Sequence, residues 1–196
     1  MSLYTECLSL TTGPLSLSPF PFFSFLMKGY LLRVIIIRVN LLGMSKILIV
    51  YHSQGGNNKK MALAVAQGVS SIDGAEAILK PAFEATLDDL LSCKGIAIGS
   101  PEYFGYMAGA IKDFFDRTYE KARDDKRAFR KPYVVFVNAG NDGSGALLSI
   151  ERICLGYRLK KVFDPIVAKG EITEDILARC REMGQTIAAG CVSGIY

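Results

Sequence analysis

The stretch KILIVYHSQGGNN, residues 46–58, decides how this chain folds. Its first part, KILIVYHS (46–53), is a largely apolar run, as expected of a strand that is buried on both faces. Two glycines and two asparagines follow at once, and residues 57–69 then have the apolar spacing of a helix. A helix N-terminus behind a glycine-rich turn presents backbone N–H groups that can hold an anion. The stretch therefore predicts an α/β fold with an anion site at the end of its first strand.

The same alternation of strand and helix continues to the C-terminus. Further strands are predicted at 76–81, 95–100, 133–140 and within 162–171, and helices at 57–69, 87–93, 108–122, 144–160 and from 173 onward. Helices between consecutive strands require parallel pairing with right-handed crossovers. We therefore predict an α/β, doubly wound, three-layer sandwich around a five-stranded parallel sheet with strand order 2-1-3-4-5.

The composition is that of one domain with a sizeable core. Half of the 196 residues are hydrophobic, and the net charge is +4. Subtracting the 3 basic and 1 acidic residues of positions 1–43 from totals of 23 and 19 leaves 20 basic and 18 acidic residues, so no nucleic-acid partner is predicted. Five cysteines without C-x-x-C spacing, and a single histidine, favour reduced thiols. We predict no metal site and a cytoplasmic location.

Residues 1–43 differ from the rest of the chain. They are rich in Ser, Leu and Phe, and Lys28, Arg33 and Arg38 interrupt their apolar stretches, so we predict no membrane span there. We interpret residues 1–43 as an N-terminal extension that is either disordered or upstream of the true start at Met44. Residues 44–196 then form the domain. A targeting or membrane-associated segment is the alternative interpretation.

Three predicted strands end in loops of unusual composition. These loops are SQGGNN (53–58), SPEYFGYMAG (100–109) and NAGNDGSGA (138–146). In the order 2-1-3-4-5 they follow the three central strands, where ligands of open α/β sheets bind. The first loop suits a phosphate, Tyr103 and Phe104 offer faces for a planar ring, and the glycines of the third allow close backbone approach. Neither G-x-x-x-x-G-K-[ST] nor G-x-G-x-x-G is present. We therefore expect a flat, phosphorylated ligand.

Two of these segments resemble a known family. SQGGNN stands where flavodoxin-like proteins have their phosphate loop, S/T-x-T-G-N-T. The segment GSPEYFGYMAGAIKDFFDRT (99–118) resembles one typical of NADPH-dependent FMN reductases and of NAD(P)H:quinone oxidoreductases of the Trp-repressor-binding-protein type. The chain is thus similar to the flavodoxin-like superfamily over about residues 45–190.

The resemblance implies that FMN is bound non-covalently. It assigns the phosphate to the first loop, the isoalloxazine ring to the second and the ring's polar edge to the third. The implied cofactor-binding residues are Ser53, Gln54, Gly55, Gly56, Asn57, Asn58, Pro101, Glu102, Tyr103, Phe104, Gly105, Ala139, Gly140 and Asn141. Gly55 and Asn58 stand where the family has threonines, so two hydroxyls are missing from the implied phosphate site.

The resemblance also implies an activity. Electrons would pass from NADPH or NADH through FMN to a quinone or a similar small-molecule acceptor. No side chain need act as acid or base, because the flavin supplies the chemistry. His52 is therefore interpreted as a strand residue. The alternative is a flavodoxin-type electron carrier without its own substrate, although the near-neutral charge gives little field for steering to a partner protein. The family resemblance is compatible with a homodimer.

Overall fold

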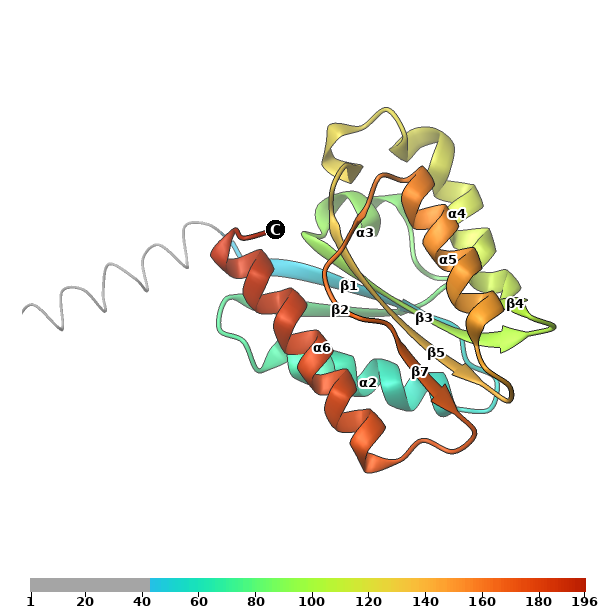
Figure 1. Ribbon diagram of the computed structural model, residues 1–196. Helices are drawn as coiled ribbons and strands as arrows, with labels where there is room; N and C mark the ends of the chain where they lie inside the picture. Colours follow the sequence, from blue (N-terminus) through green and yellow to red (C-terminus); the bar gives the residue numbers. More distant parts are fainter. Residues whose placement is uncertain (1–42) are drawn as a thin grey trace, which may run out of the picture. The chain divides into compact units, whose positions relative to one another are not determined.

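The computed structural model describes residues 43–196 (Figure 1). The prediction about residues 1–43 falls outside this range, apart from Gly43, so the boundary at Met44 stays a prediction. Among the described residues, no helix is long and apolar enough to cross a membrane.

The centre of the fold is a parallel sheet. Its strands are β1 (Ser45–Tyr51), β2 (Ala75–Pro81), β3 (Gly95–Tyr103), β5 (Pro132–Ala139), β6 (Lys160–Lys161) and β7 (Ile166–Lys169). The order is β2-β1-β3-β5 (Figure 1), and both β6 and β7 pair with β5. The predicted order 2-1-3-4-5 is confirmed, with β5 as the fourth strand and β6 and β7 together as the fifth.

The fifth strand is interrupted, which the sequence prediction did not include. Tyr133 pairs with Lys161 and Phe136 with Ile166, so the chain between Lys161 and Ile166 is longer than its partner and leaves the ladder. Pro165 lies in this gap, and proline has no N–H to donate to a strand pair.

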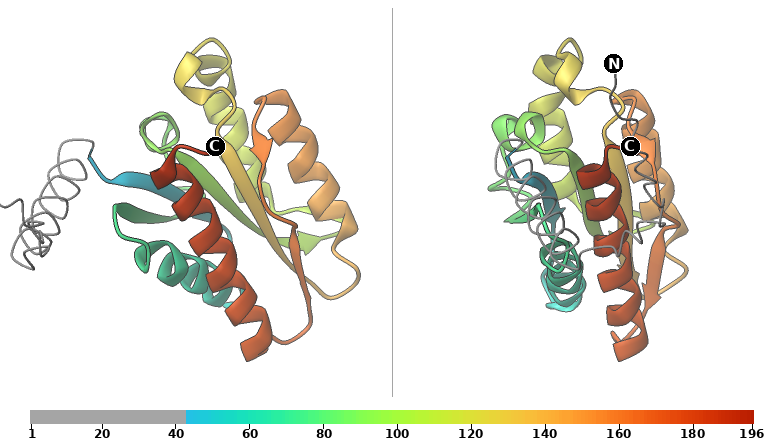
Figure 2. Two further views of the ribbon diagram at one scale, coloured as in Figure 1. Left: turned by 60° about the vertical axis from the view of Figure 1, so that its left-hand side comes forward. Right: turned by 90° about the vertical axis from the view of Figure 1, so that its left-hand side faces the viewer.

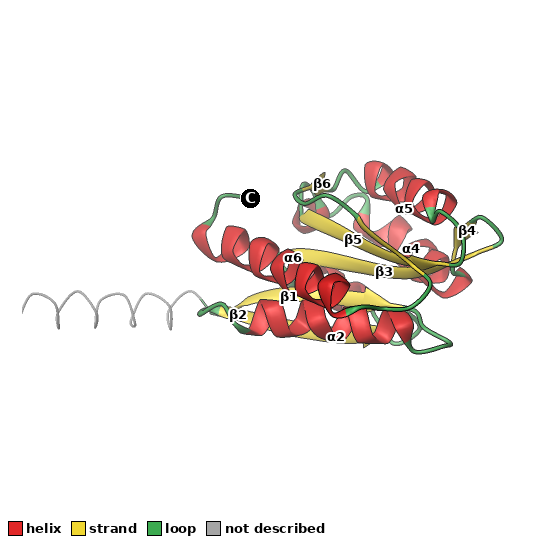
Figure 3. Cartoon of the chain, turned by 60° about the horizontal axis from the view of Figure 1, so that its bottom comes forward, coloured by secondary structure: helices red, strands yellow, loops and turns green. Residues whose placement is uncertain are grey.

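Helices cover both faces of the sheet. They are α2 (Asn57–Ser70), α3 (Leu87–Ser92), α4 (Gly109–Ala122), α5 (Ser144–Gly156) and α6 (Glu174–Ser193), with a short 3-10 helix at Lys126–Ala128. One core lies between the sheet and α2 and α6, and the other lies under α3, α4 and α5 (Figure 3). Ile47 and Ile49 of β1 enter the first core, whereas Leu48 and Val50 enter the second. This explains why β1 is apolar from Ile47 to Tyr51.

Two helices approach unusually closely. A Cβ on Gly68 of α2 would lie 2.0 Å from the carbonyl oxygen of Arg181, and one on Gly184 of α6 would lie 2.2 Å from that of Val65. The two helices therefore lie side by side (Figure 2), and at these two glycines each helix leaves no room for a side chain. Thr173 begins α6 as predicted, since its hydroxyl accepts the Ile176 N–H.

The predicted loop at 100–109 is instead a β-hairpin. β3 continues to Tyr103, and β4 (Tyr106–Met107) returns antiparallel to it. The turn residues Phe104 and Gly105 have φ values of 53° and 71°. Two consecutive left-handed residues define the turn that matches strand twist in a two-residue hairpin. The fold class is thus as predicted, with one antiparallel strand added beside the site.

The helix predicted at 144–160 is shorter than expected. α5 ends at Gly156, and the C-cap Tyr157 is followed by Arg158 in the left-handed conformation, with φ 56°. This turn sends the chain back toward the start of β5, where the Arg130 N–H donates to the Arg158 carbonyl.

Candidate functional site

The three loops predicted from the sequence meet around one pocket at the carboxyl end of the sheet. Its volume is about 200 Å³, and it is lined by Ser53, Gln54, Gly55, Asn57, Asn58, Pro101, Glu102, Tyr103, Asn138 and Gly140. The predicted residues that do not line it are Gly56, Phe104, Gly105, Ala139 and Asn141. The strand order therefore brings together most of the predicted set from three distant parts of the chain.

The first loop leaves the start of α2 open. The Gly56 N–H donates to the Ser53 hydroxyl at 3.1 Å, and Gly56 has a φ of 88°. Among the described residues, no side chain caps α2 and no acid lies in its first turn. Lys59 and Lys60 occupy that turn and are exposed. Positive side chains at the positive end of a helix dipole are unfavourable unless an anion binds there.

Asn138 joins this loop to the sheet. The Asn57 side-chain amide donates to the Asn138 Oδ1 at 3.2 Å and to the Gly170 carbonyl at 3.4 Å. Asn138 in turn donates to the carbonyls of Ala168 and Gly170, at 3.2 and 3.0 Å. Asn138 was not among the predicted site residues. The sequence signal for its role was its position, as a side-chain amide near the end of the otherwise apolar strand β5.

The hairpin supplies the aromatic wall of the pocket. The Tyr103 hydroxyl donates to the Gln54 Oε1 at 3.1 Å, which links the hairpin to the first loop. The His52 ring packs edge-on against Tyr103 and Phe83, with ring centroids 6.3 and 6.2 Å apart. Burial lowers the pKa of His52. The prediction that His52 is a strand residue is wrong, because β1 ends at Tyr51; the His52 N–H still donates to the Gly99 carbonyl at 3.0 Å. It is not one of the pocket-lining residues.

Phe104 occupies the tip of the hairpin. Its side chain is fully exposed, and its φ of 53° is rare for a residue other than glycine. An exposed large aromatic side chain on a strained backbone is typical of functional sites.

Glu102 binds the hairpin to α5. Its Oε1 accepts the N–H groups of Gly145 and Ala146 at 3.0 and 3.1 Å, and its Oε2 accepts that of Gly143 at 3.2 Å. A Cβ on Gly145 would lie 1.9 Å from the Gly105 carbonyl oxygen, so the start of α5 also touches the hairpin turn directly. The second and third loops therefore form one connected unit.

Comparison with known proteins places part of the chain beside flavin proteins. Residues 71–159 match the family of NADPH-dependent FMN reductases. A flavodoxin from Aquifex aeolicus is 45% identical over 73 residues, which are 37% of this chain and 40% of that protein. An NAD(P)H dehydrogenase (quinone) from Syntrophobacter fumaroxidans is 35% identical over 37% of this chain and 48% of its own. The chain thus spans less than half the length of these curated relatives.

Solved structures give the same result for the fold. A flavodoxin from the domain Archaea has a TM-score of 0.65 and 25% identity over 74% of this chain and 98% of its own. A flavodoxin, WrbA-like protein from Agrobacterium tumefaciens has a TM-score of 0.65 and 23% identity over 76% and 98%. The chain has the flavodoxin-like fold. The description of the matching family contains FMN and NADPH, and the name of the Syntrophobacter fumaroxidans relative contains NAD(P)H, in agreement with the FMN and NAD(P)H predicted from the sequence.

The pocket of this flavodoxin-like protein fits FMN in two respects. The open start of α2, with two lysines beside it, suits a phosphate dianion. Asn58 is 2% exposed, and among the described residues its Oδ1 has no hydrogen-bond partner. An unpaired buried oxygen costs about 1–3 kcal/mol. A ligand with hydroxyl donors, such as the ribityl chain of FMN, would satisfy it. At Gly55, where the family has a threonine, only the backbone remains to bind.

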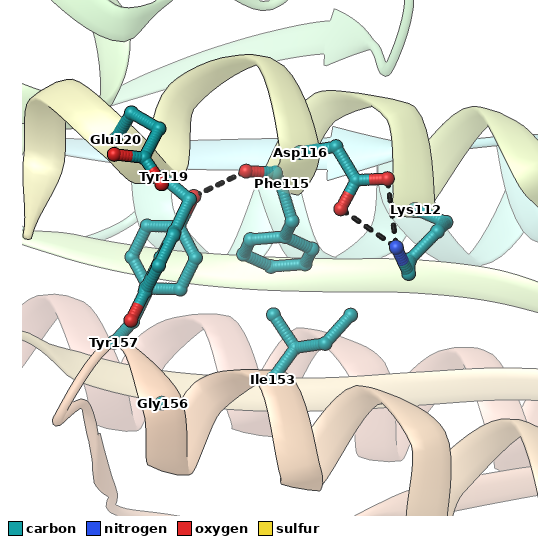
Figure 4. Close-up of a pocket in the computed structure, with 8 residues that line it drawn as sticks. All are labelled: Lys112, Phe115, Asp116, Tyr119, Glu120, Ile153, Gly156 and Tyr157. Carbon is teal, nitrogen blue, oxygen red and sulfur yellow. Dashed lines mark hydrogen bonds and ion pairs between the residues drawn. The ribbon is translucent and has the colours of Figure 1, made fainter.

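A second hollow of the flavodoxin-like domain lies between α4 and α5 (Figure 4). Its volume is about 340 Å³, and Phe115, Tyr119 and Ile153 form apolar parts of its wall. Lys112 pairs with Asp116 at 2.7 Å, and the Tyr157 hydroxyl donates to the Phe115 carbonyl. It contains none of the predicted site residues. Within residues 43–196, no three His, Cys, Asp or Glu side chains gather closely enough to hold a metal ion.

Proposed function

We propose that this flavodoxin-like protein is an FMN-dependent oxidoreductase that passes electrons from NADPH or NADH to a quinone or a similar small acceptor. One observation supports it above the others. The pocket joins an uncapped helix start to an aromatic hairpin, through the hydrogen bond between Gln54 and Tyr103. An anion site beside an aromatic wall suits a ligand that is both phosphorylated and planar.

Each wall of the pocket then has a task. The backbone N–H groups at the start of α2, with the charges of Lys59 and Lys60, bind the phosphate. Asn58 accepts a ribityl hydroxyl, and Tyr103 and Pro101 bound the ring site. When bound, FMN supplies the ability to take up a hydride equivalent and pass its electrons on. The protein's own contribution is binding, orientation and electrostatics.

A flavodoxin-type electron carrier is the second candidate. The 45% identity to the Aquifex aeolicus flavodoxin supports it. The exposed Phe104 supports the first proposal instead, since it presents an apolar surface beside the pocket to an apolar acceptor. We also infer a cytoplasmic location and a homodimer, which cell fractionation and the molar mass in solution would test.

The experiment begins with binding. The full chain should bind FMN more tightly than riboflavin, and Lys59→Gln should weaken FMN about two- to fivefold while leaving riboflavin unchanged. Lys126→Gln, an exposed lysine in the Lys126–Ala128 helix, is the matched control. Equal affinities of the wild type for FMN and riboflavin would show that the first loop binds no phosphate.

The second step measures turnover. The FMN-loaded protein should oxidise NADPH or NADH in the presence of a quinone, followed by the absorbance of the nucleotide. Flavin that neither nucleotide reduces, but that a reductase protein does reduce, would exclude the enzyme and favour the carrier.

A further inference from the structure

The carboxylate of Glu102 has an unusual position. α5 begins after Gly143, which has a φ of 74° and no side chain to cap the helix. Glu102 of strand β3 takes the place of the missing cap, because its carboxylate accepts the N–H groups of Gly143, Gly145 and Ala146. A carboxylate at a helix N-terminus is favourable for the helix. Since Glu102 also lines the candidate FMN pocket, its charge belongs to that pocket as well as to the helix.

A second carboxylate lies near the same helix start but outside the pocket. The Asp142 Oδ1 accepts the backbone N–H and the hydroxyl of Ser144, at 3.0 and 2.8 Å, and Asp142 is exposed. Its pKa is lowered by these hydrogen bonds. The two acids therefore share a helix terminus and differ in that Glu102 lines the pocket and Asp142 does not.

We propose that Glu102 is a positioning residue that locks the hairpin to α5 and lowers the midpoint potential of FMN bound in the pocket. This rests on the proposed function. Hydride transfer delivers two electrons and one proton, so it adds one negative charge to the acceptor. A fixed carboxylate in the pocket wall disfavours that charge.

Two substitutions separate the charge from the hydrogen bonds. Glu102→Gln keeps the size and one acceptor oxygen but removes the charge. The ratio of the FMN dissociation constants, oxidised over reduced, should rise about tenfold, which is a higher midpoint potential. Glu102→Asp keeps the charge on a shorter side chain. It should leave that ratio within about twofold of the wild type, while lowering the thermal unfolding temperature of the ligand-free protein more than Glu102→Gln does.

Asp142→Asn is the control, because it removes an equal charge near the same helix outside the pocket. On a logarithmic scale, the ratio of the oxidised to the reduced FMN dissociation constant should change less than a third as much in Asp142→Asn as in Glu102→Gln. Equal shifts in both variants, or no shift in Glu102→Gln, would overturn the inference. A rise in the ratio for Glu102→Asp as large as for Glu102→Gln would also overturn it, because loss of packing would then explain both. If the wild type binds no FMN at all, the proposed function fails instead, and the two failures are distinguishable.

Discussion

The first loop and the hairpin of β3 and β4 both line the pocket, but they differ in how far their polar groups are hydrogen-bonded within the chain. In the first loop, residues 53–58, a Cβ on Gly55 or Gly56 would meet nothing within 4 Å, and α2 begins without a side-chain cap among the described residues. The hairpin of β3 and β4 is fixed at several points. Ser100 accepts the Ala108 N–H at 2.9 Å, Ser149 accepts the Met107 N–H at 3.2 Å, and Glu102 holds α5.

This difference indicates two ways of building a binding site. The first loop keeps its donors and the Asn58 oxygen for a ligand, at a cost to the ligand-free protein. The polar groups of the hairpin are hydrogen-bonded to α5 already in the ligand-free protein. Phe104 is also held in its strained backbone conformation without a ligand. Substitutions in the hairpin should therefore act mainly on stability, whereas substitutions in the first loop should act mainly on the affinity for a ligand.

The largest effect is expected at Gly145. An alanine Cβ there would lie 1.9 Å from the backbone oxygen of Gly105, so the hairpin or α5 must move. We expect Gly145→Ala to reduce the free energy of unfolding by about 3 kcal/mol. Gly55→Ala is the matched control in the first loop, where the added methyl group meets open space. Urea denaturation of both variants tests this, and equal midpoints would mean that the hairpin is no more constrained than the first loop.

The next effect is expected at Asn58, with opposite signs for stability and binding. Asn58→Leu replaces an unpaired buried oxygen by an apolar group of the same branching. We expect the ligand-free protein to gain about 1 kcal/mol and FMN to bind about tenfold more weakly. Gln67→Leu makes the same kind of change on the exposed side of α2. A less stable Asn58→Leu protein would show that the amide already has a partner in the free protein.

The first loop could be predicted from the sequence because its signals are local. A buried apolar run, a glycine-rich turn and a helical period lie within residues 46–69, and the strand order follows from repeating that unit. The position of the pocket could be predicted from the strand order, because the three loops of unusual composition follow neighbouring central strands and therefore lie together.

The hairpin could not be predicted in this way. β4 has two residues, too few for a period, and phenylalanine is a poor choice for a left-handed turn position. The role of Glu102 depends on backbone N–H groups about forty positions away, which no local pattern reveals. The interruption of the fifth strand did have a signal, because Pro165 lies where the ladder breaks.

A smaller effect is expected at Phe104. Phe104→Asn would create Asn-Gly, the pair that two-residue hairpins of this turn type prefer. Relief of the left-handed strain should raise the free energy of unfolding by about 1 kcal/mol. The same change removes the exposed aromatic surface, so quinone reduction should slow severalfold while FMN affinity stays near that of the wild type. Thermal unfolding and stopped-flow reoxidation measure the two effects. Loss of stability would show that the exposed ring makes contacts worth more than its strain.

The smallest effect is expected at His52, where the two loops adjoin. Its ring packs on Tyr103 of the hairpin, and burial lowers its pKa in the folded protein. In the unfolded chain the pKa of His52 is about 6.5, so its ring binds a proton more readily there than in the folded protein. The contribution of neutral His52 to stability is complete above that pH and is lost as the pH falls through the lower, folded pKa. Because His52 is the single histidine of the chain, His52→Gln isolates its contribution. The urea midpoint of the wild type should fall more between pH 7.5 and 5.5 than that of His52→Gln. Parallel pH profiles would mean that the ring is as well solvated when folded as when unfolded, and that the two loops adjoin without burying it.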